Sequence, residues 1–229
     1  MKKIILFLII SASSASWLKA QTYLDLSTGT SNRDQVLFNA SIKKQFNEKF
    51  RAGIEIQTGL VDYRFIGAKL IEEGNSTSIS VPLLWKLFDD DRIRLNFYSR
   101  AGVRIQSVSS NYATEQLLED NSSFGYFIEP GLMVSLPLTE KFNLQSGFTL
   151  PVIIESSPVG LFENNVTNLF ATTAYQLSNK SILLFKANTG PAAGADGDSQ
   201  KYTWSFQLGL RFLLKGESNR SALVIEPSY

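Results

Sequence analysis

Residues 93–108 read IRLNFYSRAGVRIQSV, and this stretch decides the fold class. Apolar side chains recur at every second position from Ile93 to Ile105 except at Ser99, and most residues between them are polar or small. A period of two residues is the signature of a β-strand with one apolar and one polar face, because successive side chains point to opposite sides of the backbone. The stretch is also much longer than the roughly five or six residues of an ordinary globular strand.

The same alternation recurs along the chain and predicts ten strands. They cover residues 22–30, 34–44, 50–60, 77–87, 93–108, 122–138, 142–154, 165–177, 182–189 and 201–214. Short polar connections at 47–49, 89–92, 139–141 and 178–180 alternate with longer ones at 61–76, 109–121, 155–164 and 190–200. The connection at 31–33 is the exception, because it is short although the alternation of short and long connections predicts a long one there. No longer repeat and no low-complexity linker indicates a second domain.

Composition excludes several classes of function. The 229 residues include no Cys and no His, with 22 Lys or Arg against 21 Asp or Glu. The chain therefore has no disulfide framework, thiol nucleophile, iron–sulfur cluster, Ser-His triad or His-ligated metal. Its balanced charge gives no reason to expect nucleic acid as a partner.

The first twenty residues have the pattern of a secretory signal peptide. Lys2 and Lys3 precede the apolar run 4–10, small residues follow, and Ala20 precedes an expected cleavage point. The alternative is a membrane anchor, but a run of seven apolar residues is too short to span a bilayer. Because three of the basic residues lie in 1–20, the mature chain would keep 19 basic and 21 acidic residues, a net charge of −2.

A closed barrel and a soluble β-sandwich both explain alternating strands. The long strands, their even number and the alternation of short and long connections favour a membrane barrel. In lipid only a closed sheet leaves no backbone group without a hydrogen-bond partner. Aromatic residues near the strand ends predict two girdles at headgroup level. These residues are Phe50, Trp85, Phe142, Tyr175 and Phe212 near the short turns, and Tyr126 and Trp204 near the long connections.

With these features the chain resembles the small outer-membrane β-barrel proteins of Gram-negative envelopes. The resemblance rests on the signal peptide, the hairpin rhythm and segments such as 125–132, GYFIEPGL, which leads into the turn at 139–142. It implies short turns and both termini on the periplasmic side, and longer extracellular loops. Family members commonly end on an aromatic residue of the last strand. Here residues 215–229 follow the closing strand and form a C-terminal periplasmic tail, which either docks a partner or folds back on the barrel.

The polar faces of the strands predict a lumen in which basic side chains outnumber acidic ones. One interpretation is an anion-preferring channel, since excess Arg and Lys attract anions. The other, which we favour, is a packed core of mutually paired charges, because a barrel of eight to ten strands is nearly filled by its side chains. We expect Arg100 to pair with Glu129. The expected charge network comprises Glu55, Arg94, Arg100, Arg104, Glu129 and Lys186; Asp25, Arg51, Lys86 and Arg211 share the same face.

The sequence offers little support for other chemistry. Barrel enzymes that use a His beside a Ser or Asp have no counterpart here, so we predict no catalytic residue, metal site or cofactor. Residues 195–198, ADGD, contain too few ligands for a calcium loop. The expected partners are outer-membrane lipid and lipopolysaccharide, together with a protein contacted through the extracellular loops or the tail.

We therefore predict an all-β, closed, antiparallel up-and-down transmembrane barrel of about ten strands, with eight or twelve as alternatives, over residues 21–214. We predict a structural, adhesive or accessory-subunit role in an envelope assembly. The alternatives are a narrow channel for small solutes or anions, and an exported soluble barrel or sandwich that binds a ligand.

Overall fold

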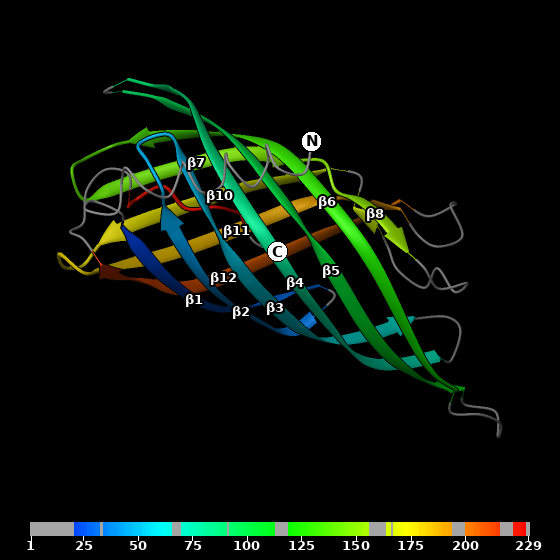
Figure 1. The fold of residues 1–229 in the computed structure, drawn as a ribbon. Coiled ribbons are helices and arrows are strands. Elements are labelled where there is room, and N and C mark those ends of the chain that lie inside the picture. The colour runs from blue at the N-terminus through cyan, green and yellow to red at the C-terminus, as the bar shows by residue number, and fades with distance from the viewer. Residues whose placement is uncertain are drawn as a thin grey trace, which may run out of the picture.

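The chain forms a closed antiparallel barrel in a computed structural model (Figure 1). The structure describes residues 21–32, 34–65, 70–90, 92–112, 119–155, 164–165, 167–193, 200–215 and 222–227. The expected signal peptide, residues 1–20, lies outside them. No helix among the described residues is long and apolar enough to cross a membrane.

Twelve strand segments build the wall. They are β1 (Thr22–Ser31), β2 (Asp34–Gln45), β3 (Phe50–Phe65), β4 (Leu70–Asp89), β5 (Arg94–Tyr112), β6 (Glu119–Pro137), β7 (Phe142–Thr149), β8 (Val152–Glu155), β9 (Asn164–Asn165), β10 (Asn168–Gln176), β11 (Ser181–Ala193) and β12 (Gln200–Lys215). β7 and β8 both pair with β6, so together they form one interrupted strand. β9 and β10 both pair with β11 and form another. The twelve segments therefore make a barrel of ten strands. The prediction of ten strands is confirmed.

The barrel is closed by pairing of its first and last strands. Asp25 of β1 lies opposite Arg211 of β12, and each neighbouring pair along the chain is antiparallel. Closure pairs both edges of the sheet, which a two-sheet sandwich does not do. The sandwich alternative is therefore wrong.

At the end with the long connections, several strands are longer than the side-chain alternation predicted. β4 begins at Leu70 rather than at residue 77, and β3 and β5 continue to Phe65 and Tyr112. Polar residues such as Glu72 and Glu73 obscure the alternation there. Strand pairing nevertheless continues, because backbone hydrogen bonds do not depend on side-chain polarity.

The interruption between β7 and β8 falls at Leu150 and Pro151, within the strand predicted over 142–154. Proline has no N–H to donate to a ladder, which explains a break at this position. The amide of Leu150 still donates to the carbonyl oxygen of Pro130 at 2.8 Å, so the strand keeps its place beside β6.

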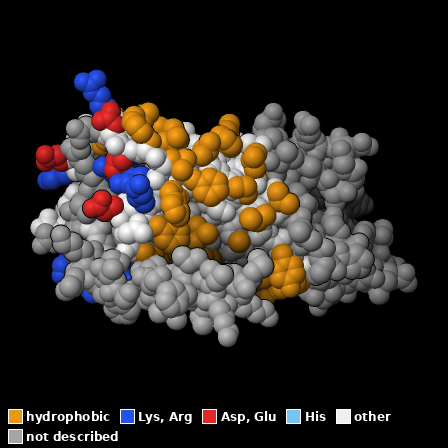
Figure 2. Space-filling view, turned by 45° about the horizontal axis from the view of Figure 1, so that its top comes forward, with side chains coloured by type: hydrophobic (Ala, Val, Ile, Leu, Met, Phe, Trp, Pro, Cys, Tyr) orange, Lys and Arg blue, Asp and Glu red, His pale blue; other side chains and the backbone are white. Residues whose placement is uncertain are grey.

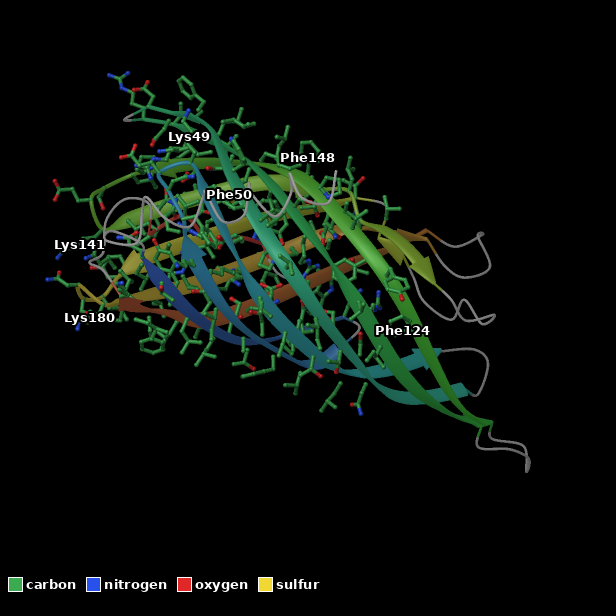
Figure 3. The ribbon with its side chains drawn as sticks, viewed as in Figure 1. Lys49, Phe50, Phe124, Lys141, Phe148 and Lys180 are labelled. Atoms are coloured by element: carbon green, nitrogen blue, oxygen red, sulfur yellow. The ribbon has the colours of Figure 1, made fainter. Side chains whose placement is uncertain are left out.

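The short connections at 47–49, 89–92, 139–141 and 178–180 lie at one end of the barrel, here called the turn end. The opposite end, the loop end, has the longer connections and the short one at 31–33. Lys49, Lys141 and Lys180 mark three of the turns at the turn end in Figure 3, with Phe124 toward the other end. Side-chain oxygens fix the turns locally. Asn47 Oδ1 accepts from the amides of Lys49 and Phe50, each at 2.8 Å, and the Thr139 hydroxyl accepts from two amides in the same way.

The outer surface of the wall is apolar and exposed. Figure 2 shows hydrophobic side chains across the middle of the visible wall and charged side chains gathered at one end. Ile54 is 61% exposed, an unusual value for an isoleucine in a sheet unless the sheet faces lipid or a partner. The exposed set includes Phe38, Ile42, Ile54, Ile79, Val81, Ile105, Ile128, Phe185, Phe206 and Leu208.

The inner surface carries many small and polar side chains, together with apolar ones near the turn end. Glycine is required on this surface where strands approach closely. A Cβ added at Gly102 of β5 would lie 2.2 Å from the carbonyl oxygen of Ile79 and 2.7 Å from Ser80 Cα, both on β4. Neither contact involves a flexible side-chain end, so the backbone itself would have to move.

We expect Gly102→Ala to lower the free energy of unfolding by about 1–3 kcal/mol, the range for overpacking. Heat-modifiable migration of the barrel on gels would measure the change as a lower unfolding temperature. Ala101→Val is the matched control, because Ala101 is exposed on the outer face of the same strand. Equal unfolding temperatures for Gly102→Ala and the wild type would contradict the close approach of β4 and β5.

Candidate functional site: the filled lumen

The C-terminal tail lies inside the barrel. All six described tail residues, Ala222–Pro227, are buried, and the red segment in Figure 1 lies within the outline of the wall. They contact side chains from nearly every strand of the barrel. The tail expected on the periplasmic side is thus inside the barrel over these residues. Of the two arrangements left open by the sequence, the structure has the tail folded back.

Apolar tail side chains pack against apolar residues that point into the lumen. Ala222, Leu223 and Ile225 share one cluster with side chains of β1, β10, β11 and β12, while Val224 packs against β4, β5, β6 and β10. The wall residues are Tyr23, Ala174, Ile182, Leu184 and Leu213 in the first cluster, and Leu84, Tyr98, Met133 and Phe170 in the second. Burial of these side chains away from water is the main favourable term that holds the tail.

The tail backbone is bound by polar side chains of the wall. Arg211 Nη1 donates to the carbonyl oxygens of Ala222 and Val224 at 2.9 and 2.7 Å. Asn143 and Gln145 both donate to the Leu223 carbonyl oxygen, at 2.9 and 2.8 Å. These bonds satisfy carbonyl groups that would otherwise be buried without a partner.

Further bonds fix the direction of the tail. Arg51 Nη1 donates to the Val224 carbonyl oxygen at 2.6 Å, and the Ile225 amide donates to Gln145 Oε1 at 2.9 Å. The Tyr98 hydroxyl donates to the Pro227 carbonyl oxygen at 3.0 Å. The wall thus contacts successive peptide groups of the tail from β3, β5 and β7.

Glu226 places a carboxylate among three buried cations. Its oxygens lie 3.2 Å from Lys43 Nζ, 3.1 Å from Arg51 Nη1 and 3.0 Å from Arg211 Nη2. Asp25 is the second anion, 2.6 Å from Arg211 Nε and 3.2 Å from Lys43 Nζ. Burial alone would raise the pKa of the Glu226 carboxyl, but the three cations outweigh it and hold that pKa well below its usual range.

A second ion cluster lies farther from the turn end. Arg100 Nη2 is 2.6 Å from Glu129 Oε2, and Arg100 Nη1 is 3.1 Å from Glu55 Oε1. Thr149 and Asn168 donate to the other oxygen of Glu129. The pair expected between Arg100 and Glu129 is therefore present, on residues directly opposite each other on β5 and β6.

Lys43 connects the two clusters. Its Nζ lies 3.7 Å from Glu55 Oε2 and also contacts the Asp25 and Glu226 carboxylates. The paired charges therefore run without a break from the tail to the middle of the wall. A continuous set of pairs reduces the cost of burying each ion, because every charge has more than one partner.

Of the remaining residues of the predicted network, Lys186 is close enough to interact electrostatically with Lys43, Glu55 and Asp25, whereas Arg94 pairs near a turn. Arg94 Nε lies 2.6 Å from Asp89 Oδ1, close to a turn. Lys186 is buried on β11, and Arg104 is half-buried on β5, above Arg100. Lys43 was not among the predicted residues, although its alternation with Ser41 places it on the inner face. Glu226 was not predicted either, because no strand pattern covers it.

All seven residues predicted for the aromatic girdles point away from the lumen. Trp85, Tyr126, Tyr175 and Trp204 are exposed, and Phe50, Phe142 and Phe212 are half-buried. Phe50 lies opposite Trp85 with ring centroids 5.7 Å apart, and Phe142 lies opposite Tyr175. Neighbouring rings thus line the wall near the turns.

A small pocket opens beside the tail at the turn end. Its lining combines basic, acidic, polar and apolar side chains: Gln45, Glu48, Lys49, Arg51, Leu84, Lys86, Arg94, Asn96 and the tail residue Val224. Two of its cations are already paired, since Lys86 and Arg94 both contact Asp89, at 2.7 and 2.6 Å. An anionic ligand in this pocket would therefore have to compete with Asp89 for these two side chains.

No family model and no curated protein matches the sequence. Among solved structures, the barrel is similar to the translocator domain of autotransporter NalP from Neisseria meningitidis. The TM-score is 0.52 at 12% identity, over 93% of this chain and 94% of that one. This chain has the outer-membrane β-barrel fold.

Two further barrels of this fold match with lower scores. A major outer membrane protein from Thermus thermophilus has a TM-score of 0.45 at 12% identity, over 85% of this chain and 99% of that one. The outer membrane protease OmpT from Escherichia coli has a TM-score of 0.41 at 9% identity, over 85% and 96%. At such identities the likeness concerns the fold and not the activity.

Proposed function

We propose that this chain is an integral outer-membrane protein with a sealed lumen and a structural, adhesive or accessory-subunit role in the envelope. The observation that carries the proposal is the burial of Ala222–Pro227 inside the barrel. A solute crossing the barrel would have to displace a peptide segment that apolar clusters, hydrogen bonds and ion pairs hold in place. The role then belongs to the surfaces of the barrel rather than to a path through it.

The outer surface supports placement in a lipid bilayer. Large hydrophobic side chains cover the wall, and charged side chains gather at the turn end (Figure 2). The expected signal peptide accounts for export, and lipid and lipopolysaccharide then become the immediate partners. The soluble alternative predicts release from envelope fractions without detergent. Recovery of folded protein in a detergent-free extract would exclude the membrane proposal.

We expect the full chain to show no steady single-channel current in planar bilayers. The reason is that the tail and the paired charges fill the turn-end half of the lumen. Heat-modifiable migration on gels would first establish that the inserted protein is folded. A steady open current from folded wild-type protein would contradict the sealed lumen and favour the narrow-channel alternative.

We also propose that the chain is not an enzyme. It has no His, and its described buried carboxylates are committed to ion pairs with Arg and Lys. A carboxylate engaged in such ion pairs would have to give them up before it could exchange a proton with a substrate. Incubation of the folded protein with lipid and peptide substrates would test this, and turnover above background would contradict it.

An accessory role requires a partner, and the buried tail restricts where that partner binds. Residues 222–227 face the lumen, so a partner cannot contact them while the tail is in place. This favours contact through the loop end. Affinity purification in mild detergent tests the role: a stoichiometric envelope protein supports an accessory subunit, and recovery of the barrel alone favours a solitary role.

A further inference from the structure

We propose that the turn-end half of the lumen is a binding site for an extended apolar peptide with a glutamate, and that its occupant, the C-terminal tail, closes a latent anion-selective conduit. This inference rests on the sealed lumen proposed above. It adds that the tail is a removable occupant of a binding site and that its departure opens the lumen to anions. It concerns the site formed by Lys43, Arg51, Gln145 and Arg211 together with the apolar wall clusters.

The site has the features of a peptide-recognition surface. Side chains, rather than a β-ladder, hold the described tail residues: Arg51, Asn143, Gln145 and Arg211 donate to tail carbonyl oxygens. The wall supplies apolar contacts for four successive tail side chains, Ala222–Ile225, and a triple cation site for Glu226. Backbone recognition combined with side-chain pockets is how proteins bind extended segments.

The tail is not part of the wall, so the wall does not need it to stay closed. The ten strands pair completely around the barrel, with β1 joined to β12. Backbone hydrogen bonds of the wall would therefore persist if the tail left. What would change is the filling of the lumen.

The tail lies across the interior of the barrel within the turn-end half of the lumen. Residues that bind it come from opposite parts of the wall: Arg211 from β12, and Tyr98 from β5, which lies halfway around the ring of strands from β12. A segment in contact with both sides occupies the path between them. Its departure would leave side chains of the wall alone around that path.

The exposed lining would be basic. At this level the wall carries Lys43, Arg51, Lys186 and Arg211 against Asp25 and Glu55, all buried in the present state. Departure of the tail also removes Glu226, the third anion. Rings of Arg and Lys favour anions over cations in a pore. The channel and packed-core interpretations of the lumen then describe two states of one barrel.

A cleavable tail tests the proposal on a barrel that has already folded. A specific protease site inserted between Lys215 and Gly216 leaves residues 216–229 as a separate peptide after cleavage. We expect the uncut protein to be silent in planar bilayers. After cleavage and a high-salt wash we expect steady current steps, with a reversal potential in a potassium chloride gradient of the sign for chloride preference.

Synthetic peptide 216–229 tests the binding site directly. Added to the cleaved, washed barrel on the turn side, it should remove the current steps in a saturable way. A peptide with Glu226→Gln should need a higher concentration, because it lacks the charge that meets Lys43, Arg51 and Arg211. A peptide of scrambled sequence is the composition control and should leave the current unchanged.

A full-length variant covers the case in which the inserted site is not cut. Glu226→Lys places a fourth cation among Lys43, Arg51 and Arg211, and we expect intermittent anion-selective openings from folded protein. Folded barrels that stay silent after loss of the tail, or in Glu226→Lys, would overturn the conduit. Current that intact peptide and scrambled peptide block equally would overturn the peptide site. Current from the uncut wild type would instead refute the sealed lumen itself.

Discussion

Replacing Glu226 with glutamine is expected to lower the free energy of unfolding by about 3–5 kcal/mol, the cost of breaking a buried ion pair by removing one partner. Glutamine keeps the size of the side chain and removes only the charge. Lys43 would then keep Asp25 and Glu55, Arg211 would keep Asp25, and Arg51 would lose its ion pair with Glu226. Urea unfolding in lipid vesicles, followed by tryptophan fluorescence, would measure the loss.

The control for Glu226→Gln is Glu140→Gln, the same substitution at an exposed turn residue. A surface charge contributes little, so we expect a change below about 0.5 kcal/mol. The double variant Lys43→Met/Glu226→Gln removes one charge of each sign and should recover part of the lost stability. A Glu226→Gln variant as stable as the Glu140→Gln control would show that the tail carboxylate is not held by the cations.

The low pKa of Glu226 determines how its contribution to the free energy of unfolding changes with pH. A carboxyl whose pKa is depressed on folding stabilises the protein above its unfolded pKa, and that contribution is lost as pH falls through the folded pKa. Since Lys43, Arg51 and Arg211 hold the folded pKa well below the usual range, the tail should stay bound in moderate acid. The stability difference between the wild type and Glu226→Gln should therefore persist from neutral pH to about pH 5.

The wall could be predicted from the sequence because each strand carries its own signal. Alternation in the stretch 93–108 and in its counterparts gave ten strands, the inner face and the pairing of Arg100 with Glu129. Those inferences need only strand parity and distance from a shared turn. The break near Pro151 and the extra length of β4 were not predicted, because they depend on pairing between strands and not on the pattern within one strand.

The filling of the lumen could not be predicted in the same way. The tail is irregular, so no period marks which of its residues are buried. A weaker signal was present in the wall, where Leu84, Met133, Ile182 and Leu213 put apolar side chains on the inner face of strands that are otherwise polar inside. Apolar residues on both faces of a strand near one end of a barrel require an apolar partner within the lumen. Applied to this chain, the rule predicts that an apolar segment such as Ala222–Ile225 lies within the lumen.

Replacing Arg100 with glutamine is expected to cost about 3–5 kcal/mol, because it leaves two buried carboxylates without their shared guanidinium. Arg100 is the residue that bridges Glu55 on β3 and Glu129 on β6, two strands that are not neighbours in the sheet. Thr149 and Asn168 would still donate to Glu129, but their neutral groups cannot balance its charge. The unfolding midpoint in urea should fall without a change in slope.

Arg100→Lys separates the charge of the arginine from its geometry. Lysine keeps a cation but lacks the planar group whose Nε and Nη2 donate together to Glu129 at 3.0 and 2.6 Å while Nη1 reaches Glu55. We therefore expect Arg100→Lys to lose about 1–3 kcal/mol, the cost of hydrogen bonds to charged groups left unmade. Arg92→Gln, at an exposed turn position, serves as the control. If Arg100→Gln and Arg100→Lys were equally destabilised, the two-sided geometry would be what matters at this position; if both matched Arg92→Gln, the bridge across the lumen would not contribute to stability.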